Sequence, residues 1–571
     1  MTERISRRKF MAGAIAAAAS TGLAGTGPWI RGGVSQKDYD LVVKGGFVYD
    51  GRGGPGFESD IGVKDGSILK VGSIPMEKAA AVVEAKGLAV CPGFIDMHAH
   101  TDVELLVNPK AESAVRQGIT TLVSGNCGSS GCMVPDQVFE ETKASLKEVY
   151  GLELEWRDLK GFFSRLERSG TALNYATLTG HGDVRGAGMG YADRPPTEAE
   201  LEKMKQLLRD DLRCGAAGLS SGLEYTPGSY ARPEELTALC RVAADMNGVY
   251  ATHMRDEGDR LLESLEESID VARKSGVSLQ ISHFKTAYPR NWHKLDRALA
   301  LIESAEREGV RIFCDRYPYI AGATDLSFYY PLWVREGTTE DFLRRLRDKV
   351  REPEVRAHLD AAEKKLGSWD KVVVSDVVSE KNKPIEGRSI LEAAKASGRE
   401  PYDFMRELLL EEKGRGGIVI FMMREENLKT ILAHPLVSVG TDGSALAPTG
   451  PLGQGKPHPR HYGTFPRVLG KYIREEKILP PETMIRKMTS VAAEKFHFHK
   501  RGRVEAGFFA DLVVFDPDKV ADRATWTEPH QFPAGIEYVL VNGKVVVDRG
   551  EHTGRLPGRI LRPLAGKEKS V

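Results

Sequence analysis

Two histidines one residue apart, His98 and His100, close an apolar run and are well suited to metal chemistry. In an extended strand, residues i and i+2 project from the same face, so the two imidazoles can converge on one ion. Neutral imidazole suits zinc and similar metals, whose sites combine histidine with cysteine and carboxylate ligands. An isolated His-x-His pair is more often an ordinary surface or core feature, so a metal site requires further ligands elsewhere in the chain.

Further metal-type side chains stand where later apolar runs end. They are Cys127 after 119–123, His181 after 173–178, His253 after 249–252, His283 after 277–281, Asp315 after 310–313 and Asp442 after 436–440. Together with the runs at 90–95 and 217–220, this makes eight short segments rich in Val, Ile, Leu or Thr. Each is bounded by glycine or a polar residue, which is typical of a buried β-strand.

Amphipathic helical patterns alternate with these runs. The segments 198–214, 233–246, 260–275 and 292–308 place apolar residues at spacings of three and four among charged ones. Strands alternating with helices, with metal-type side chains at the carboxyl ends of the strands, predict an α/β fold of the (β/α)8 TIM-barrel class over residues 91–495. The active sites of such barrels lie at that rim.

The chain ends predict a second domain. Residues 38–90 and 496–555 contain short strand patterns with turns, and neither segment is long enough to bury a core alone. We therefore expect both chain ends to form one small β-sandwich, followed by a tail at 556–571. The segment at about 345–423, between the seventh and eighth barrel strands, is too long for a simple crossover. It predicts a mainly helical insertion over the barrel mouth.

Residues 1–37 predict a signal segment and linker. Ser6-Arg7-Arg8-Lys9-Phe10-Met11, an uncharged stretch to Ile30 and small residues around Ala24 resemble a twin-arginine signal, which favours export to the periplasm or beyond. The alternative is an uncleaved membrane anchor. Its alanine and glycine content makes the stretch only weakly hydrophobic, and we expect no stable membrane span once the signal is removed.

The composition favours a small-molecule enzyme. The 571 residues include 80 basic and 80 acidic ones, a formal net charge of zero, which argues against general binding to nucleic acid or anionic membranes. Six cysteines are too sparse for a disulfide framework in a chain of this length.

Several motifs together resemble the amidohydrolase superfamily. They are Pro92–His100, Gly118–Thr121 with Gly125–Gly128, Thr252–Arg255 and Ile281–His283. The segment around Cys127, Tyr317-Pro318-Tyr319 and His458–Arg467 are similar to the N-acyl-D-amino-acid deacylase, or D-aminoacylase, branch of that superfamily. The resemblance extends over residues 39–550.

The resemblance implies a zinc-dependent amidase that releases a carboxylate and a free D-amino acid. Cys127, His253 and His283 would hold a tight zinc ion, and His98, His100 and Asp442 would frame a second, weaker metal position. Zinc lowers the pKa of bound water to about 7, and an aspartate would move the proton from water to the leaving amine. Asp442 is the residue expected to do so, although an aspartate in a Gly-Thr-Asp-Gly sequence is more often a simple turn residue.

The resemblance also implies a site for the carboxylate of the amino acid. Arg460 would bind it, with Lys285 and Tyr317 as helpers; alternatively, Arg460 caps a loop or pairs with a surface acid. His181, Arg255 and Asp315 are expected to support the ligands from behind. The same metal site could instead cleave dipeptides, including those with a D-residue, or cyclic amides. A non-catalytic protein of this fold is the remote alternative.

Overall fold

The computed structural model describes residues 37–564. The twin-arginine segment predicted within residues 1–37, and residues 565–571 of the predicted tail, lie outside the described residues. Between residues 37 and 564, no helix combines the length and the apolar character needed to cross a bilayer.

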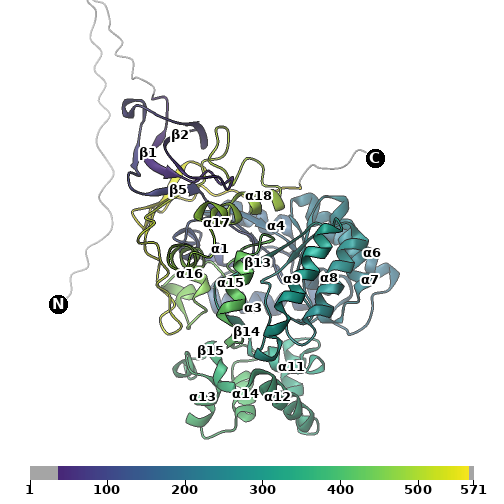
Figure 1. Cartoon of the computed structure of the whole chain (residues 1–571). Helices are drawn as coiled ribbons and strands as arrows, with labels where there is room; N and C mark the ends of the chain where they lie inside the picture. Colours follow the sequence, from purple (N-terminus) through teal and green to yellow (C-terminus); the bar gives the residue numbers. More distant parts are fainter. Residues whose placement is uncertain (1–36, 565–571) are drawn as a thin grey trace, which may run out of the picture. The chain divides into compact units, whose positions relative to one another are not determined.

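Each of the eight segments predicted as barrel strands contains a strand. One of them, β13, is labelled near the middle of Figure 1. The strands are β6 (Phe94–Asp96), β7 (Ile119–Ser124), β8 (Asn174–Thr177) continued by β9 (Thr179–Gly180), β10 (Gly218–Gly222), β11 (Val249–His253), β12 (Ser278–Ile281), β13 (Ile312–Arg316) and β17 (Val437–Val439). They form two parallel sheets in the orders β6-β7-β8 and β9-β10-β11-β12-β13-β17. The fold is a TIM-barrel-like α/β arrangement.

The two parallel sheets meet at both of their edges. Only Leu178 separates β8 from β9, and its N–H donates a 2.9 Å hydrogen bond to Ser124 O on β7. At the other edge, Ala99 and Gly443 form a parallel bridge, and the N–H of Asp442 donates to His98 O at 2.7 Å. The last strand therefore ends beside the first, which brings residues far apart in sequence to one rim.

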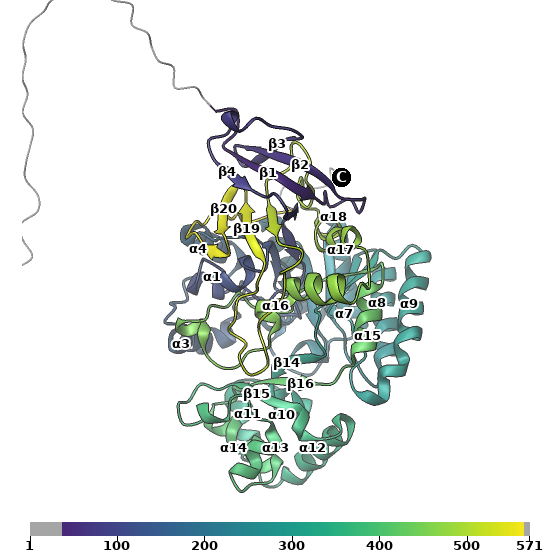
Figure 2. The ribbon, with the colours of Figure 1, turned by 60° about the vertical axis from the view of Figure 1, so that its left-hand side comes forward.

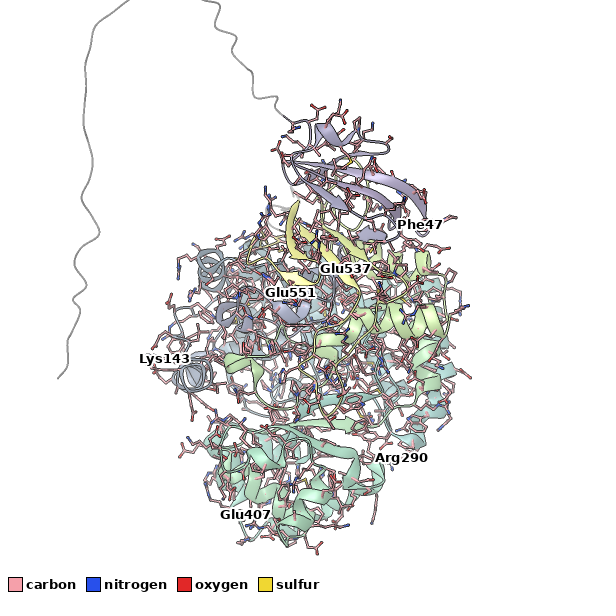
Figure 3. All side chains as sticks on the ribbon, turned by 90° about the vertical axis from the view of Figure 1, so that its left-hand side faces the viewer. Phe47, Lys143, Arg290, Glu407, Glu537 and Glu551 are labelled. Atoms are coloured by element: carbon pink, nitrogen blue, oxygen red, sulfur yellow. The ribbon has the colours of Figure 1, made fainter. Side chains whose placement is uncertain are left out.

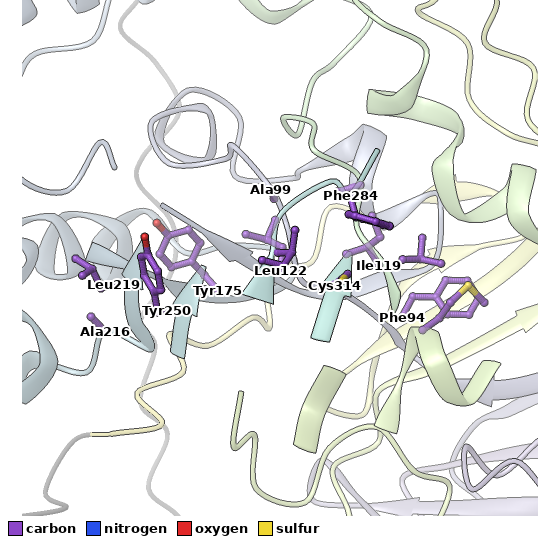
Figure 4. Packing of buried hydrophobic residues seen from close by; sticks show 14 of the residues in the cluster. Phe94, Ala99, Ile119, Leu122, Tyr175, Ala216, Leu219, Tyr250, Phe284 and Cys314 are labelled. Atoms are coloured by element: carbon purple, nitrogen blue, oxygen red, sulfur yellow. The ribbon is translucent and has the colours of Figure 1, made fainter. Parts of the chain in front are cut away.

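The helices pack apolar faces against these strands. The predicted helical segments correspond to α6 (Glu198–Cys214), α7 (Pro233–Asp245), α8 (Leu261–Ser275) and α9 (Leu295–Arg307). α6 begins with a reciprocal capping box between Thr197 and Glu200. α9 begins three residues later than predicted, because Pro289–Lys294 forms a 3-10 turn instead. Side chains from neighbouring strands, among them Leu122, Tyr175 and Tyr250, share one core (Figure 4).

Shorter helices complete the connections between strands and follow the last one. They are α1 (Glu104–Val107), α2 (Glu112–Val115), α3 (Phe139–Tyr150), α4 (Leu159–Ser169), α5 (His181–Met189), α15 (Glu425–Ala433), α16 (Arg460–Arg467), α17 (Pro481–Met488) and α18 (Ser490–Lys495).

Both chain ends contribute to one nine-stranded sheet. Its strands are β1 (Leu41–Val48), β2 (Phe57–Lys64), β3 (Ser67–Val71), β4 (Val82–Glu84) and β5 (Ala89–Pro92) from the first part of the chain, and β18 (Leu512–Phe515), β19 (Ile536–Val541), β20 (Lys544–Asp548) and β21 (Glu551–His552) from the last. The antiparallel pair β5–β18 joins the two parts. Val43, Ile61 and Leu512 belong to the buried core of this sheet, whereas Phe47 remains 41% exposed at its surface (Figure 3).

The run at 90–95, predicted as a single barrel strand, is divided at Gly93. Residues before it belong to β5 in the nine-stranded sheet, and residues after it form β6. A Cβ at Gly93 would lie 2.1 Å from Thr120 Oγ1, so only glycine fits where the chain passes from one sheet to the other. An uninterrupted apolar run hides such a division, because residues on both sides are equally buried.

The segment between β13 and β17 forms an insertion with its own core (Figure 2). Its helices are α10 (Leu332–Arg335), α11 (Thr339–Leu346), α12 (Glu352–Leu366), α13 (Ile390–Ala396) and α14 (Pro401–Glu411), so it is mainly helical. It also contains a three-stranded antiparallel sheet, which the sequence interpretation did not include. The strands are β14 (Ala321–Asp325), β15 (Val372–Asp376) and β16 (Gly417–Phe421), with β16 in the middle.

Candidate metal centre and substrate cavity

The predicted ligands and Asp442 stand at the carboxyl ends of five different strands. His98 and His100 follow β6, Cys127 follows β7, and His283 follows β12. His253 is the last residue of β11, and Asp442 follows β17. These residues, His98 excepted, line a cavity of about 790 Å³. The strand order places them at one rim.

Four of these residues bring their donor atoms within 4.8 Å of one another: His98, Cys127, His283 and Asp442. Cys127 Sγ lies 3.5 Å from Nε2 of both His98 and His283. Asp442 Oδ1 lies 3.3 Å from His98 Nε2. Thiolate, imidazole and carboxylate form a donor set that suits zinc, and a cation would fit among them.

Asp315 orients the first of these histidines. Its carboxylate accepts a hydrogen bond from His98 Nδ1 at 3.0 Å, and both side chains are fully buried. This contact leaves His98 Nε2 directed at Cys127, as expected for a ligand held from behind by a carboxylate. Gln280 donates a 2.6 Å hydrogen bond to Asp315 and fixes that carboxylate in turn.

The backbone is strained at three of the four residues. Cys127, His283 and Asp442 have φ values of 53°, 37° and 51°, in the left-handed region that non-glycine residues rarely adopt. Each such conformation costs on the order of 1–3 kcal/mol and tends to occur at functional sites. The fold therefore directs these three side chains toward one point even though the backbone conformation of each residue is strained.

The charges around Cys127 favour its thiolate. Burial alone would raise the pKa of this thiol, but His98 and His283 outweigh it and hold the pKa well below its usual range. Cys132, five residues away, is in the opposite situation, because burial raises the pKa of its thiol. Of these two cysteines, Cys127 has the character of a metal ligand.

His100 and Asp442 interact directly. His100 Nε2 lies 3.0 Å from Asp442 Oδ1. Burial lowers the pKa of His100, but Asp442 and Cys127 together outweigh this effect and raise the pKa to about 9. Burial would also raise the pKa of Asp442, yet Arg460, His283 and His98 hold it well below its usual range. Asp442 is therefore ionised at neutral pH.

His253 lies beside this group and contacts two glutamates that the sequence interpretation missed. Its ring centroid is 4.6 Å from that of His283, and its Nε2 lies 3.0 Å from Glu224 Oε2. His253, His283 and Glu257 form a second cluster of potential ligands. Glu257 stands four residues after His253, but nothing in the sequence indicated that it would turn back toward the site.

The three predicted substrate-binding residues all line the cavity. Arg460 Nη1 donates a 2.7 Å hydrogen bond to Asp442 Oδ2, and its guanidinium carbon lies 5.0 Å from the centre of the Tyr317 ring. Lys285 forms a buried ion pair with Glu257 and lies 2.7 Å from His283 Nδ1. Both cations are thus held close to the metal-ligand candidates.

Two other polar residues expected to support the ligands are engaged elsewhere. His181 Nε2 lies 2.8 Å from Glu235 Oε1, and Arg255 pairs with Glu267 at 2.9 Å. Neither residue lines the cavity or belongs to a ligand cluster.

Comparisons with known proteins agree with this geometry. The N-acyl-D-glutamate deacylase of Alcaligenes xylosoxydans xylosoxydans is 35% identical over 527 residues, which cover 92% of this chain and 97% of that protein. The D-aminoacylase of the same organism is 35% identical over 532 residues, with 92% and 99% covered.

A solved structure is similar over the same extent. It is the crystal structure of N-acyl-D-glutamate deacylase from Bordetella bronchiseptica, complexed with zinc and a phosphonate mimic of the tetrahedral intermediate. It superposes with a TM-score of 0.78 at 33% identity and covers 92% of this chain and 100% of that one. Residues 81–547 also match the model of the amidohydrolase family. The chain therefore belongs to the amidohydrolase family and, within it, to the N-acyl-D-amino-acid deacylase branch.

Proposed function

We propose that this protein is a metal-dependent amidohydrolase that cleaves N-acyl-D-amino acids to a carboxylate and a free D-amino acid. The observation that carries the proposal is the convergence of Cys127, His98, His283 and Asp442 at the rim of one cavity. The similarity of this protein to deacylases of this class over nine-tenths of the chain supports the same reaction.

We infer that the metal is zinc. Cys127, His253 and His283 would hold one tight ion, and His98, His100 and Asp442 would frame a second, weaker position. The lowered pKa of Cys127 and the fixed orientation of His98 support ligation, because both prepare donors for a cation. When bound, zinc polarises an amide carbonyl and makes water acidic enough to ionise near neutral pH.

Asp442 has the properties that proton transfer requires. It is ionised at neutral pH, lies in the cavity and is held by Arg460 and His100. In the proposed reaction, its carboxylate accepts a proton from the attacking water and returns it to the leaving nitrogen. Arg460, whose position Tyr317 fixes from one side, binds the carboxylate of the amino acid through paired N–H donors.

We propose three further features of the architecture. The contacts between β8 and β9, and between Ala99 and Gly443, favour one closed (β/α)8 barrel over residues 91–495. The nine-stranded sheet favours a β-sandwich made of residues 38–90 and 496–555. The helices α11 to α14 favour a mainly helical insertion at about 345–423.

We also propose export by a twin-arginine signal within residues 1–37. A reporter fused to these residues should reach the periplasm, and Arg7→Lys with Arg8→Lys should keep it inside. Export that survives this double substitution would contradict the proposal.

An assay of purified protein tests the function. N-acetyl-D-leucine should be hydrolysed faster than N-acetyl-L-leucine, D-containing dipeptides or cyclic amides, and a chelator should abolish turnover until zinc is restored. Preferred cleavage of dipeptides or cyclic amides would replace the proposed substrate class. A protein that binds no zinc and hydrolyses none of these compounds would be a non-catalytic member of the family.

A further inference from the structure

The charge of the cavity differs between its two ends. Among the described residues that line it, Lys285 and Arg460 are the only lysine and arginine. Lys285 is bound to Glu257, and Arg460 to Asp442. His458 and His461 also line the cavity, but burial holds the pKa of His458 well below its usual range and lowers that of His461 to about 3. Every cation of the lining is therefore close to the metal centre.

The insertion contributes two carboxylates to the other part of the lining. Asp325 ends β14, Asp376 ends β15, and both stand opposite Gly417 at the start of the central strand β16. Residues directly opposite one another on neighbouring strands point to the same face. Both aspartates line the cavity, so the two carboxylates share one region of it.

Gly417 makes room for this arrangement. A Cβ at that position would lie 1.9 Å from Asp376 Oδ2 and 2.5 Å from Ser375 Oγ. The Asp376 carboxylate accepts a hydrogen bond from Ser375 Oγ, and neither aspartate forms an ion pair with another described residue. Desolvation by the surrounding protein, followed by the charge of Asp376, raises the pKa of Asp325 to about 6. Two like charges, on side chains that are both exposed to solvent, thus stand at the cavity without a counter-cation.

Strand β14 relates these carboxylates to the metal centre. At its start, Ala321 O accepts a 2.9 Å hydrogen bond from His458, two residues before Arg460. At its end, Thr324 Oγ1 is 3.4 Å from the hydroxyl of Tyr225, whose ring packs against His253 at 4.9 Å. Five extended residues span about 13 Å between the first and last Cα atoms. Asp325 is therefore one residue beyond the contact with Tyr225 and about a strand's length from the Arg460 end.

The lining between these ends includes apolar side chains. Phe328 and Met422 are partly buried beside the core of the insertion, to which Ile418 and Ile420 belong, and all four residues line the same cavity. A flexible hydrocarbon stem that ends in a cation can lie along such a surface and place its charge at the acidic end.

We propose that this cavity selects substrates that carry a cationic group on the part remote from the metal centre, and that it rejects substrates with a carboxylate there. The selection rests on the proposed deacylase function and deepens it. Asp325 and Asp376 are its specificity-determining residues, because they attract an ammonium or guanidinium group and repel an acid. The cation can belong to the amino-acid side chain or to the acyl group, since either can extend from the amide toward β14.

Zinc-loaded enzyme tests the proposal with two pairs of substrates. N-acetyl-D-lysine against N-acetyl-D-glutamate varies the side chain, and 6-aminohexanoyl-D-leucine against adipoyl-D-leucine varies the acyl group. We expect kcat/KM to favour the cationic member of at least one pair by about tenfold or more. The Asp325→Asn/Asp376→Asn double variant should reduce that ratio by about tenfold, and Asp376→Asn alone by less.

Asp360→Asn is the matched control, because Asp360 is an exposed carboxylate on α12 of the same insertion and does not line the cavity. For Asp360→Asn, the ratio of kcat/KM values within each substrate pair should equal that of the wild type. Inhibition of N-acetyl-D-leucine hydrolysis by free D-lysine and D-glutamate provides a second readout, in which the tested compounds themselves are not hydrolysed. A wild-type preference for the acidic members, or ratios that the double variant leaves unchanged in both pairs, overturns the proposal. Failure to hydrolyse any substrate, N-acetyl-D-leucine included, overturns the proposed function and with it this inference.

Discussion

Arg460 donates a 2.7 Å hydrogen bond to Asp442. The residue predicted to hold the substrate carboxylate is thus bonded to the residue predicted to move the proton. Arg460 helps to keep the pKa of Asp442 low. A substrate carboxylate bound to Arg460 would therefore weaken the interaction between Arg460 and Asp442. Substrate binding and proton transfer are therefore electrostatically coupled at this point of the cavity.

Removal of the Asp442 charge should abolish proton transfer but leave the protein loaded with metal. For Asp442→Asn, we expect kcat to fall by about 10²–10⁴-fold, the usual contribution of a positioned acid or base. Zinc content should remain close to that of the wild type, because Cys127, His253 and His283 are unchanged. Metal analysis and steady-state kinetics on the same preparation check both expectations. A variant with more than a tenth of wild-type kcat would exclude Asp442 from this role.

Replacement of Arg460 should affect substrates with a free carboxylate more than substrates in which that carboxylate is replaced by a carboxamide. Arg460→Met should lower kcat/KM for N-acetyl-D-leucine by roughly 10- to 150-fold, the value of one or two hydrogen bonds to a charged group. N-acetyl-D-leucinamide lacks the carboxylate, so its smaller loss measures only the effect on Asp442. Arg467→Met, on the same helix but outside the cavity lining, should not distinguish the two substrates. Equal losses for acid and amide would show that Arg460 does not bind the carboxylate.

The two neighbouring cysteines should differ in their effect on metal content. Loss of a residue that only supports a metal ligand typically weakens metal binding by about 10–100-fold. Cys127→Ser removes a ligand itself, so it should weaken zinc binding by more than that. Cys132→Ser should retain zinc, because Cys132 contacts the hydroxyls of Tyr175 and Thr177 rather than the ligand cluster. Chelator competition measures both affinities. Unchanged zinc affinity in Cys127→Ser would remove this thiol from the metal centre.

The nine-stranded sheet has a buried carboxylate whose contribution to stability depends on pH. Asp60 accepts hydrogen bonds from Lys44 Nζ at 2.7 Å and from the N–H groups of Gly45 and Ile74. Burial would raise the pKa of Asp60, but these donors lower it below its usual value. The stabilisation is therefore present above the unfolded-state pKa of about 4 and is lost as the pH falls through the lower pKa of the folded state.

Asp60→Asn should accordingly reduce the free energy of unfolding at pH 7 by about 1–3 kcal/mol, and by less at pH 3. Denaturant titration at the two pH values measures the difference. Glu58→Gln, exposed on the same strand, should have no effect at either pH. A deficit of Asp60→Asn that is as large at pH 3 as at pH 7 would contradict this account.

Sequence patterns located the strands and the side chains at their carboxyl ends, because each such assignment depends on a local run and the residue that follows it. Cys127 and His283 could be identified in this way. Glu224 and Glu257 could not, since they reach the site through loops whose course depends on tertiary packing. The hydrogen bond between Arg460 and Asp442 was not predicted, for the same reason. Strands β14 to β16 were missed because short strands inside a helical segment resemble loops or helix ends.

Zinc-edge X-ray absorption of the metal-loaded protein identifies the atoms bound to the metal. One sulfur ligand at about 2.3 Å should be present together with nitrogen ligands at about 2.0–2.1 Å. The sulfur contribution should disappear in Cys127→Ser and persist in Cys132→Ser. A spectrum of the wild-type protein with only nitrogen and oxygen neighbours would contradict a metal centre built on Cys127.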